Sequence, residues 1–251
     1  MTAPTPVRPP DTQATGPATF PTLTATVFAV TLTVSVAALF IPDLMALFTR
    51  DLAKVRQGQW WRVVTPLLVQ SSGWGQLVFN LAGLAVVGAV VERRVSRTTW
   101  ALIYLVGGVG SIGLGSAWHP AATGGGSSDA IAALIGAIAV LVVVDGRPSG
   151  HDWPAQVYSI FFVTYLTALA LAGVVPSIVV GDASMIILFT ARRAMNPTTL
   201  ARACLIVVAA GGALMSLAQD GHGTGMVAGI AIAAIVVAHR RLPTANRLQR
   251  R

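Results

Sequence analysis

The chain has 251 residues, of which 54% are hydrophobic and only 10% are charged, and its mean hydropathy is +0.71. These values exclude an ordinary soluble domain and indicate a polytopic membrane protein, since a bilayer core about 30 Å thick needs roughly 20 apolar residues per helix. The net charge of +8 does not indicate binding of nucleic acid, because the basic residues lie in short runs between apolar segments.

The first half of the chain alternates between polar segments and long apolar ones. Residues 1–19 are rich in proline, threonine and alanine and are predicted to form a disordered tail, because they cannot build a core. Residues 20–41 are predicted to form the first membrane span. Between residues 42 and 73, charged side chains alternate with leucines and with Trp60 and Trp61, which predicts an amphipathic segment at the membrane interface. Further spans are predicted at residues 75–91, 99–118 and 127–144.

Four more apolar stretches follow, at residues 157–173, 174–189, 200–217 and 222–238, so we expect about eight spans. The sixth span, at residues 174–189, is the weakest candidate for a full crossing of the membrane. Asp182 lies inside it, and an intramembrane carboxylate is typical of a transport path, whereas the adjacent Gly181 favours a break or a bend at the interface. The membrane domain is expected to cover residues 20–239, followed by a basic cytoplasmic tail at residues 240–251.

The distribution of charge predicts the orientation. Eight crossings from a cytoplasmic N-terminus place thirteen arginines on the inner side and leave only Arg50, Lys54, Arg56 and Arg62 outside. This is the usual bias of membrane proteins, and it predicts that both termini are cytoplasmic. Because arginine supplies sixteen of the seventeen basic residues, which is typical of GC-rich bacterial genomes, we expect an integral protein of a bacterial plasma membrane.

Two polar side chains begin apolar spans that this topology brings to the outer face. Ser128 ends a glycine-rich loop at the start of the fourth span, and His222 opens the last span. A serine at such a junction is usually a helix cap, but a histidine within about 3 Å would make it a nucleophile. Their meeting requires an odd number of spans between them. Ser127 would take the place of Ser128 if the helix register were shifted by one residue.

Five blocks occur in the order and approximate spacing of the rhomboid intramembrane serine proteases. They are Gly58-Gln-Trp-Trp-Arg-Val-Val-Thr-Pro66, Trp74-Gly-Gln-Leu-Val-Phe-Asn-Leu81, Val91-Glu-Arg-Arg94, Gly126-Ser-Ser-Asp129 and His222-x-x-Gly225-x-x-x-Gly229. The chain therefore resembles this family over roughly residues 20–144 and 200–238. The resemblance implies an all-α polytopic membrane protein with a rhomboid-type six-helix core. The uncovered stretch at residues 155–190 would then contain two additional transmembrane helices.

The resemblance also assigns expected roles. Ser128 is similar to the family's nucleophile, His222 to its general base, and Asn80 to the asparagine that stabilises the oxyanion. Gln76 lies one turn before Asn80 on the same helix face and offers a second amide donor. No metal or other cofactor is implied.

Five further residues resemble structural positions of the family. Trp61 and Arg62 resemble a pair in the first outer loop, and Glu92 resembles an acidic residue that closes the second span. Gly225 and Gly229 resemble the glycines that allow the last helix to pack closely on the fourth, as small residues one turn apart permit.

Two positions depart from the family pattern. Gln76 stands where many members have a histidine, and Asp129 stands where the family has a glycine. We interpret Asp129 as a first-turn acid favoured by the helix dipole, pointing roughly 100° away from Ser128 and not orienting His222. Its charge would oppose a developing oxyanion unless it is solvated or paired. Among other polar residues, His119 is expected to be a solvated loop residue and Asp220 to belong to the outer loop.

The sequence thus supports three hypotheses. The first is a serine endopeptidase that cuts transmembrane segments of membrane-protein substrates near the outer face of the lipid bilayer. The second is a catalytically inactive rhomboid-like protein that binds membrane helices, motivated by Asp129 and Gln76. The third is a small transporter built around Asp182. Nucleic acid is not an expected partner in any of them.

Overall fold

The computed structural model describes residues 20–146 and 150–241, with the side chain of His151 excepted. The expected tail at residues 1–19 and residues 242–251 of the expected basic tail lie outside this part. Within it the chain forms helices and no named strand, and eight helices are long and apolar enough to span a membrane. The prediction of an all-α polytopic membrane protein with about eight spans is therefore confirmed.

The eight candidate spans follow the predicted order with slightly different bounds. They are α1 (Thr22–Phe40), the segment Trp74–Glu92, α6 (Arg97–Trp118), α7 (Ser128–Asp145), α8 (Trp153–Ala172), α9 (Val174–Ala194), α10 (Pro197–Leu217) and α11 (Gly221–Arg241). The segment Trp74–Glu92 consists of α4 (Trp74–Gly83), a π-helical turn η3 (Leu84–Gly88) and α5 (Ala89–Glu92).

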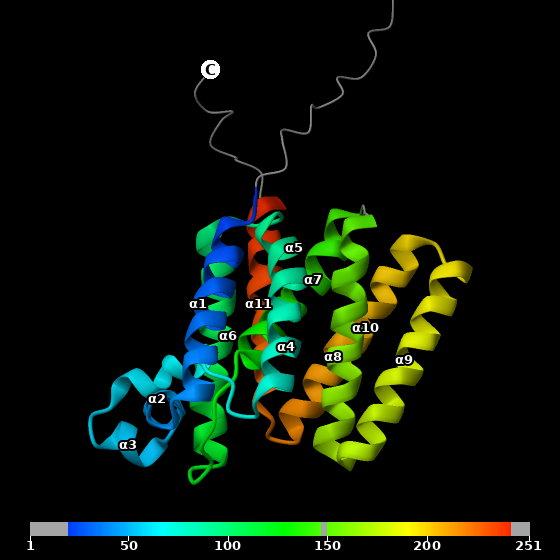
Figure 1. The fold of residues 1–251 in the computed structure, drawn as a ribbon. Helices are drawn as coiled ribbons and strands as arrows, with labels where there is room; N and C mark the ends of the chain where they lie inside the picture. The colour runs from blue at the N-terminus through cyan, green and yellow to red at the C-terminus, as the bar shows by residue number, and fades with distance from the viewer. Residues whose placement is uncertain (1–19, 147–149, 242–251) are drawn as a thin grey trace, which may run out of the picture.

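The helices run up and down in one bundle (Figure 1). Both ends of the described chain lie at one end of the bundle, and the starts of α7 and α11 lie at the other. The segment predicted to be amphipathic forms α2 (Pro42–Phe48), α3 (Leu52–Arg56), η1 (Trp60–Val63) and η2 (Thr65–Leu68) at this second end. Three spans therefore separate α7 from α11, the odd number that the meeting of Ser128 and His222 requires.

The sixth stretch forms a full helix. α9 is continuous over 21 residues and passes through Gly181 without interruption, so the expected break or bend is absent. Gly181 is buried instead, and a Cβ there would come within 3.0 Å of the Phe161 ring on α8. The glycine allows α9 to pack closely on its neighbour.

Helix α7 forms the centre of the bundle. Its apolar side chains are almost all buried, and α6, α10 and α11 surround it together with the second span. It begins directly after the glycine-rich loop and ends at Gly146, whose φ of 63° is the left-handed conformation that glycine adopts at helix ends. Its position fixes Ser128, its first residue, at one end of the core.

Helices α7 and α11 approach each other through glycine. A Cβ at Gly225 would overlap the backbone oxygen of Asp129, and one at Gly229 would overlap that of Ala133. Gly136 of α7 meets the backbone of Met226 in the same way. Since only glycine allows backbones this close, these positions set the distance between the two helices that begin with Ser128 and His222.

Candidate active site

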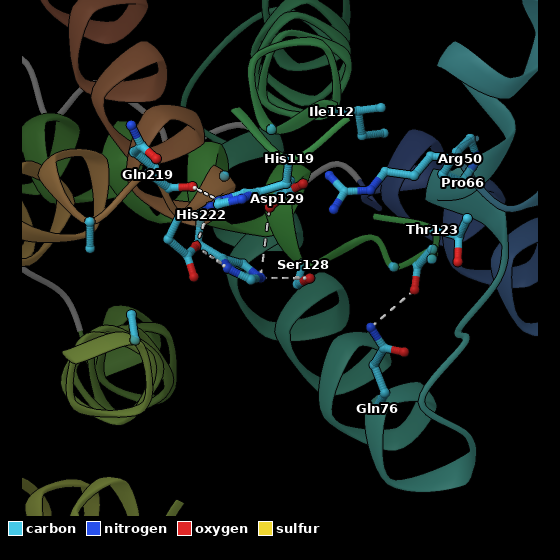
Figure 2. Close-up of a pocket in the computed structure, with 18 residues that line it drawn as sticks. Arg50, Pro66, Gln76, Ile112, His119, Thr123, Ser128, Asp129, Gln219 and His222 are labelled. Atoms are coloured by element: carbon cyan, nitrogen blue, oxygen red, sulfur yellow. Dashed lines mark hydrogen bonds and ion pairs between the residues drawn. The ribbon is translucent and has the colours of Figure 1, made fainter. Parts of the chain in front are cut away.

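A cavity of about 320 Å³ opens at the end of the bundle where α7 and α11 begin (Figure 2). Ser128, Asp129 and His222 line it together with Asp220 of the α10–α11 turn and Gln76 of α4. The residues come from three distant parts of the sequence. The fold therefore gathers polar side chains in one pocket at the end of an otherwise apolar bundle.

Ser128 and His222 are in direct contact. The serine Oγ and the histidine Nε2 are 2.9 Å apart, which is hydrogen-bond distance. Both side chains are held by the first turn of a rigid helix, and the glycine contacts between α7 and α11 keep these turns together. This is the geometry that hydroxyl-based covalent catalysis requires of a nucleophile and its base.

The two adjacent serines occupy different environments. Ser127 is fully buried, and its Oγ accepts a hydrogen bond from Gln70 Nε2 at 3.4 Å. Ser128 is the first residue of α7 and faces the cavity. The helix register thus presents Ser128 to His222, and Ser127 points into the protein.

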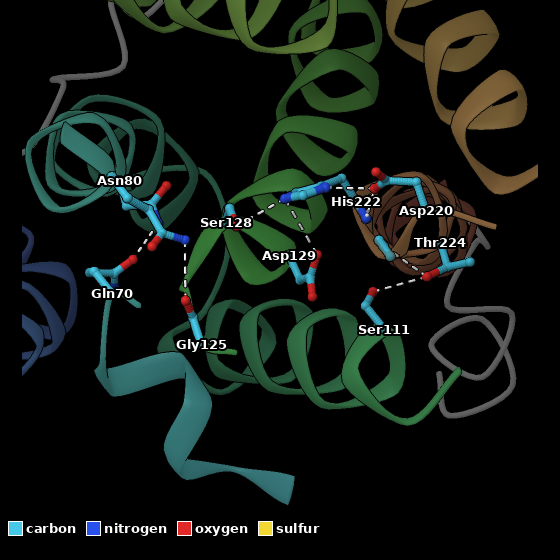
Figure 3. A network of polar contacts seen from close by, with 11 residues as sticks. Gln70, Asn80, Ser111, Gly125, Ser128, Asp129, Asp220, His222 and Thr224 are labelled. Atoms are coloured by element: carbon cyan, nitrogen blue, oxygen red, sulfur yellow. Dashed lines mark hydrogen bonds and ion pairs between the residues drawn. The ribbon is translucent and has the colours of Figure 1, made fainter. Parts of the chain in front are cut away.

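Asp220 makes a contact that the sequence analysis did not anticipate. Its Oδ1 lies 2.6 Å from His222 Nδ1 and 2.9 Å from the His222 backbone nitrogen, which donates to it (Figure 3). Burial alone would raise the pKa of the Asp220 carboxyl, but the hydrogen bonds and charge of His222 outweigh this effect and lower the pKa below its usual value. One feature of the sequence could have indicated this contact. Asp220 comes directly before the last apolar span, and aspartate is favoured as the N-cap residue of a helix.

Asp129 also faces the His222 ring, from the opposite side. Its Oδ1 is 3.7 Å from His222 Nε2, too far for a hydrogen bond. Asp129 does point to a different side of α7 from Ser128, but α11 packs so closely that His222 Nε2 lies near both side chains (Figure 3). The imidazole therefore has a carboxylate on each side, with the hydrogen-bonded one at Nδ1.

The loop before α7 contacts an amide side chain of α4 that lines the cavity. Gln76 Nε2 donates to the Gly125 carbonyl at 3.2 Å, and its Oε1 accepts from the Ser72 backbone N–H at 2.9 Å. A Cβ at Gly126 would overlap Gln76 Nε2 and come within 3.3 Å of Ser128 Oγ. Gly126 thus keeps a space open between the serine hydroxyl and the glutamine amide.

Asn80 lies one turn further along α4 and is 1% exposed. Its Nδ2 donates to Gln70 Oε1 at 2.6 Å, and its Oδ1 is buried without a hydrogen-bond partner. Gln70 in turn contacts Ser127. Asn80, which the resemblance predicts to be an oxyanion donor, is therefore engaged with Gln70 and does not line the cavity. No pattern in the sequence indicates this contact.

Trp61 and Arg62 tie η1 to α2. Trp61 Nε1 donates to the Leu47 carbonyl at 3.2 Å. Arg62 is 3% exposed, and its Nη1 donates to the Ala46 and Thr49 carbonyls at 2.7 Å each. These bonds join η1 to α2 at the end of the bundle that carries the cavity.

Glu92 lies at the opposite end of the bundle. Its two carboxylate oxygens accept hydrogen bonds from the backbone N–H groups of Leu23 and Thr24, at 3.0 and 2.7 Å. These donors belong to the first turn of α1, where a negative charge is favoured by the helix dipole. Glu92 thus fastens the second span to the start of the first.

The other polar residues considered from the sequence lie in different places. His119 lines the cavity, with Nε2 3.3 Å from the Gln219 carbonyl. His239 contacts Ile235 near the end of α11, and the His151 side chain is outside the described part. Asp182 is exposed on α9 and lines neither this cavity nor the apolar groove between α4, α8 and α9.

Comparison with known proteins agrees with the resemblance noted in the sequence. The family model described as the Rhomboid domain matches residues 57–239. Rhomboid protease GluP of Bacillus subtilis (strain 168) is 39% identical over 70 residues, which are 28% of this chain and 14% of that protein. Putative rhomboid protease YdcA of the same strain is 33% identical over 60 residues, 24% of this chain and 30% of that protein. The matches thus span less than a third of either relative.

Proposed function

Because this chain belongs to the rhomboid family, we propose that it is an intramembrane serine endopeptidase that cleaves transmembrane segments of membrane proteins near the outer face. The observation that carries the proposal is the 2.9 Å contact between Ser128 Oγ and His222 Nε2 at the mouth of a cavity. The relatives named as rhomboid proteases support the same chemistry.

The reaction begins with attack of Ser128 Oγ on the carbonyl carbon of the scissile peptide bond. His222 Nε2 accepts the hydroxyl proton as the new C–O bond forms, and the ring then returns this proton to the nitrogen of the leaving peptide as the C–N bond breaks. The product is an acyl-enzyme on Ser128. Water reaches the cavity from the open end and repeats the two proton transfers to release the acid and restore the serine.

The tetrahedral intermediate carries a negative oxygen, which requires hydrogen-bond donors. The first N–H groups of α7 have no acceptors within the helix, and Ser128 is the first residue of that helix, so they are candidate donors to the oxyanion. The Gln76 amide borders the space that Gly126 leaves beside Ser128 Oγ, so it is the side-chain donor best placed to assist them. Asn80 can donate to the oxyanion only if its amide gives up the hydrogen bond to Gln70 Oε1.

The eight candidate spans and the charge bias support a specific membrane orientation. We propose that the protein lies in a bacterial plasma membrane with both termini in the cytoplasm, so that the cavity opens at the outer face. Reporter enzymes fused after Gly150 and after Pro197 test this orientation. Both fusions should report a cytoplasmic location, and an external location of either contradicts the assignment.

The function is tested with a single-span reporter protein reconstituted with the purified chain in liposomes. Wild type should cut the reporter near one membrane face, and Ser128→Ala and His222→Ala should not. Cutting that survives in Ser128→Ala contradicts the proposed nucleophile. Terminal sequencing of the fragments locates the cut relative to the bilayer.

A second function is favoured by two specific features of the site. Asp129 places a carboxylate 3.7 Å from His222 Nε2, and the Asn80 amide is already bonded to Gln70. Both features oppose stabilisation of an oxyanion and suit an inactive protein that binds membrane helices. Such a protein would bind the reporter helix in the same liposomes, with equal affinity in Ser128→Ala, and leave it uncut.

A further inference from the structure

We infer that Asp220 is a positioning residue of this site, whose carboxylate holds the His222 ring with Nε2 directed at Ser128. The inference rests on the proposed protease function and extends the pair of Ser128 and His222 to a third side chain. Asp220 acts through His222, because it orients the base and does not itself contact the reacting atoms.

The geometry leaves the His222 ring little freedom. A single oxygen, Asp220 Oδ1, is 2.9 Å from the backbone nitrogen of His222 and 2.6 Å from its Nδ1. The opposite ring nitrogen is 2.9 Å from Ser128 Oγ. The Phe162 ring packs edge-on against the imidazole, with 6.0 Å between ring centroids. The imidazole is thus held at both nitrogens and against one face.

The turn that carries Asp220 is itself fixed by hydrogen bonds. The Asp220 backbone N–H donates to the Met215 carbonyl at 2.9 Å, and the Asp220 carbonyl accepts from Gly223 at 3.2 Å. Gln219 adopts a φ of 59°, which closes the turn tightly between α10 and α11. The carboxylate therefore projects from a defined backbone position.

These contacts select one tautomer of the neutral ring. A neutral imidazole carries one N–H, and a carboxylate at Nδ1 retains the hydrogen on that nitrogen. The lone pair then lies on Nε2, where it accepts the Ser128 proton as the serine attacks. The resulting imidazolium donates from Nδ1 to Asp220 until Nε2 gives its proton to the leaving nitrogen, and Asp220 remains a carboxylate throughout.

Asp220→Ser separates this role from simple helix capping. A serine side chain can still accept a hydrogen bond from the backbone N–H of His222 as an N-cap, but it is too short for its oxygen to reach His222 Nδ1. We expect the thermal midpoint to stay within a few degrees of wild type, the KM for the reporter to change less than about twofold, and kcat to fall about 10- to 100-fold. The rate of Ser128 labelling by a fluorophosphonate should fall by a similar factor.

Asp129→Asn is the charge-matched comparison, because it removes a carboxylate from the other side of the same ring. Its kcat should fall much less than that of Asp220→Ser. Equal losses in the two variants would show a general effect of charge and contradict positioning through Nδ1. A wild-type rate in Asp220→Ser, or a loss confined to KM, would also overturn the inference.

A readout without catalysis separates this inference from the proposed function. Nitrogen-15 NMR of the His222 ring, recorded where the ring is neutral, should show the proton on Nδ1 in wild type and a mixture of tautomers in Asp220→Ser. If wild type holds the Nδ1 proton but cleaves nothing, the protease function fails and the positioning stands. A wild-type ring protonated at Nε2 overturns the positioning whatever the activity.

A different observation, on the outer surface of α9, supports a second proposal. We propose that this face binds a transmembrane helix of another protein that carries a basic side chain at the same depth. Asp182 is the ninth residue of the 21-residue α9 and is exposed. Val179 and Ile186, about one turn away on either side, are 63% and 70% exposed.

The carboxylate has no partner within the described part of the chain, where no hydrogen bond or ion pair joins it to another residue. A charged side chain in the interior of a membrane is costly, and it normally faces a protein partner of complementary charge or polarity. The basic residues Arg192, Arg193 and Arg202 lie near helix ends. Two copies joined through this face would bring like charges together, so a basic side chain of a different protein fits better.

The probe is a polyleucine helix with one central lysine, compared with an all-leucine helix of the same length. Energy transfer in vesicles between labelled peptide and labelled protein should show at least tenfold tighter binding of the lysine peptide. Asp182→Asn should remove this preference and retain reporter cleavage. Equal binding of both peptides overturns the proposal, as does self-association of the protein that depends on Asp182.

Discussion

Replacing Gly229 by alanine tests whether glycine packing holds the Ser128–His222 pair together. A Cβ at Gly229 would overlap the backbone carbonyl oxygen of Ala133, so α11 must retreat from α7 by about 1 Å. His222 begins the same helix and lies two turns earlier, and its Nε2 would move from 2.9 Å to roughly 3.9 Å from Ser128 Oγ, beyond hydrogen-bond distance.

A misplacement of this size in an active site costs about 100-fold in rate, or about 2.7 kcal/mol in activation free energy. Overpacking should also lower the free energy of unfolding by about 1–3 kcal/mol. The assay measures kcat/KM for the reporter and the rate of fluorophosphonate labelling, at a temperature where the variant remains folded. We expect both to fall about 100-fold.

Gly110→Ala is the matched control, because a Cβ at Gly110 of α6 meets nothing within 4 Å. It makes the same chemical change in another membrane helix and should preserve both stability and rate. If folded Gly229→Ala reacts at the wild-type rate, or if Gly110→Ala loses as much, the glycine contacts do not set the geometry of the site.

Three further predictions concern residues that join elements of the fold or orient the site. Arg62→Lys has one nitrogen in place of a guanidinium whose Nε bonds the Gln59 side chain while its Nη1 bonds the Ala46 and Thr49 carbonyls, so it should lower the unfolding free energy by about 1–3 kcal/mol; an unchanged thermal midpoint would contradict this. Glu92→Gln weakens the anchor on the first turn of α1 and should cost about 0.5–2 kcal/mol, with faster amide exchange in that turn than in wild type. Because the folded-state pKa of Asp220 is lowered, its stabilisation is complete above the ordinary pKa of about 4 and is lost as pH falls through the folded value. The wild-type thermal midpoint should therefore fall more steeply from pH 5 to pH 3 than that of Asp220→Asn, and parallel curves would refute this.

The sequence predicted the elements with strong periodic or compositional signals. Each span is a long apolar run, so its existence follows from the cost of unpaired backbone groups in lipid. The resemblance predicted the contact of Ser128 with His222, and parity allowed it, because three spans bring the two helix starts to one end. The break or bend predicted at Gly181 was wrong, because a glycine within a helix is compatible either with a break or with close packing. Only the position of the Phe161 ring shows that close packing applies here.

The side-chain network of the site was harder to predict. Asp220 reaches His222 through a turn whose shape depends on the backbone of Gln219, which sequence patterns do not specify. Gln70 lies in an irregular segment between η2 and α4, so its bond to Asn80 could be found only from the three-dimensional structure. Asp129 faces His222 because α11 lies so close to α7, a distance that depends on the packing of two whole helices.

The most direct test of the central claim is to locate a fluorophosphonate label by mass spectrometry on the folded protein in membranes. The label should lie on Ser128, be absent from Ser128→Ala, remain in Ser127→Ala, and form much more slowly in His222→Ala. A label on Ser127, or no label on any serine of the folded wild type, would contradict the assignment of Ser128 and His222 as nucleophile and base.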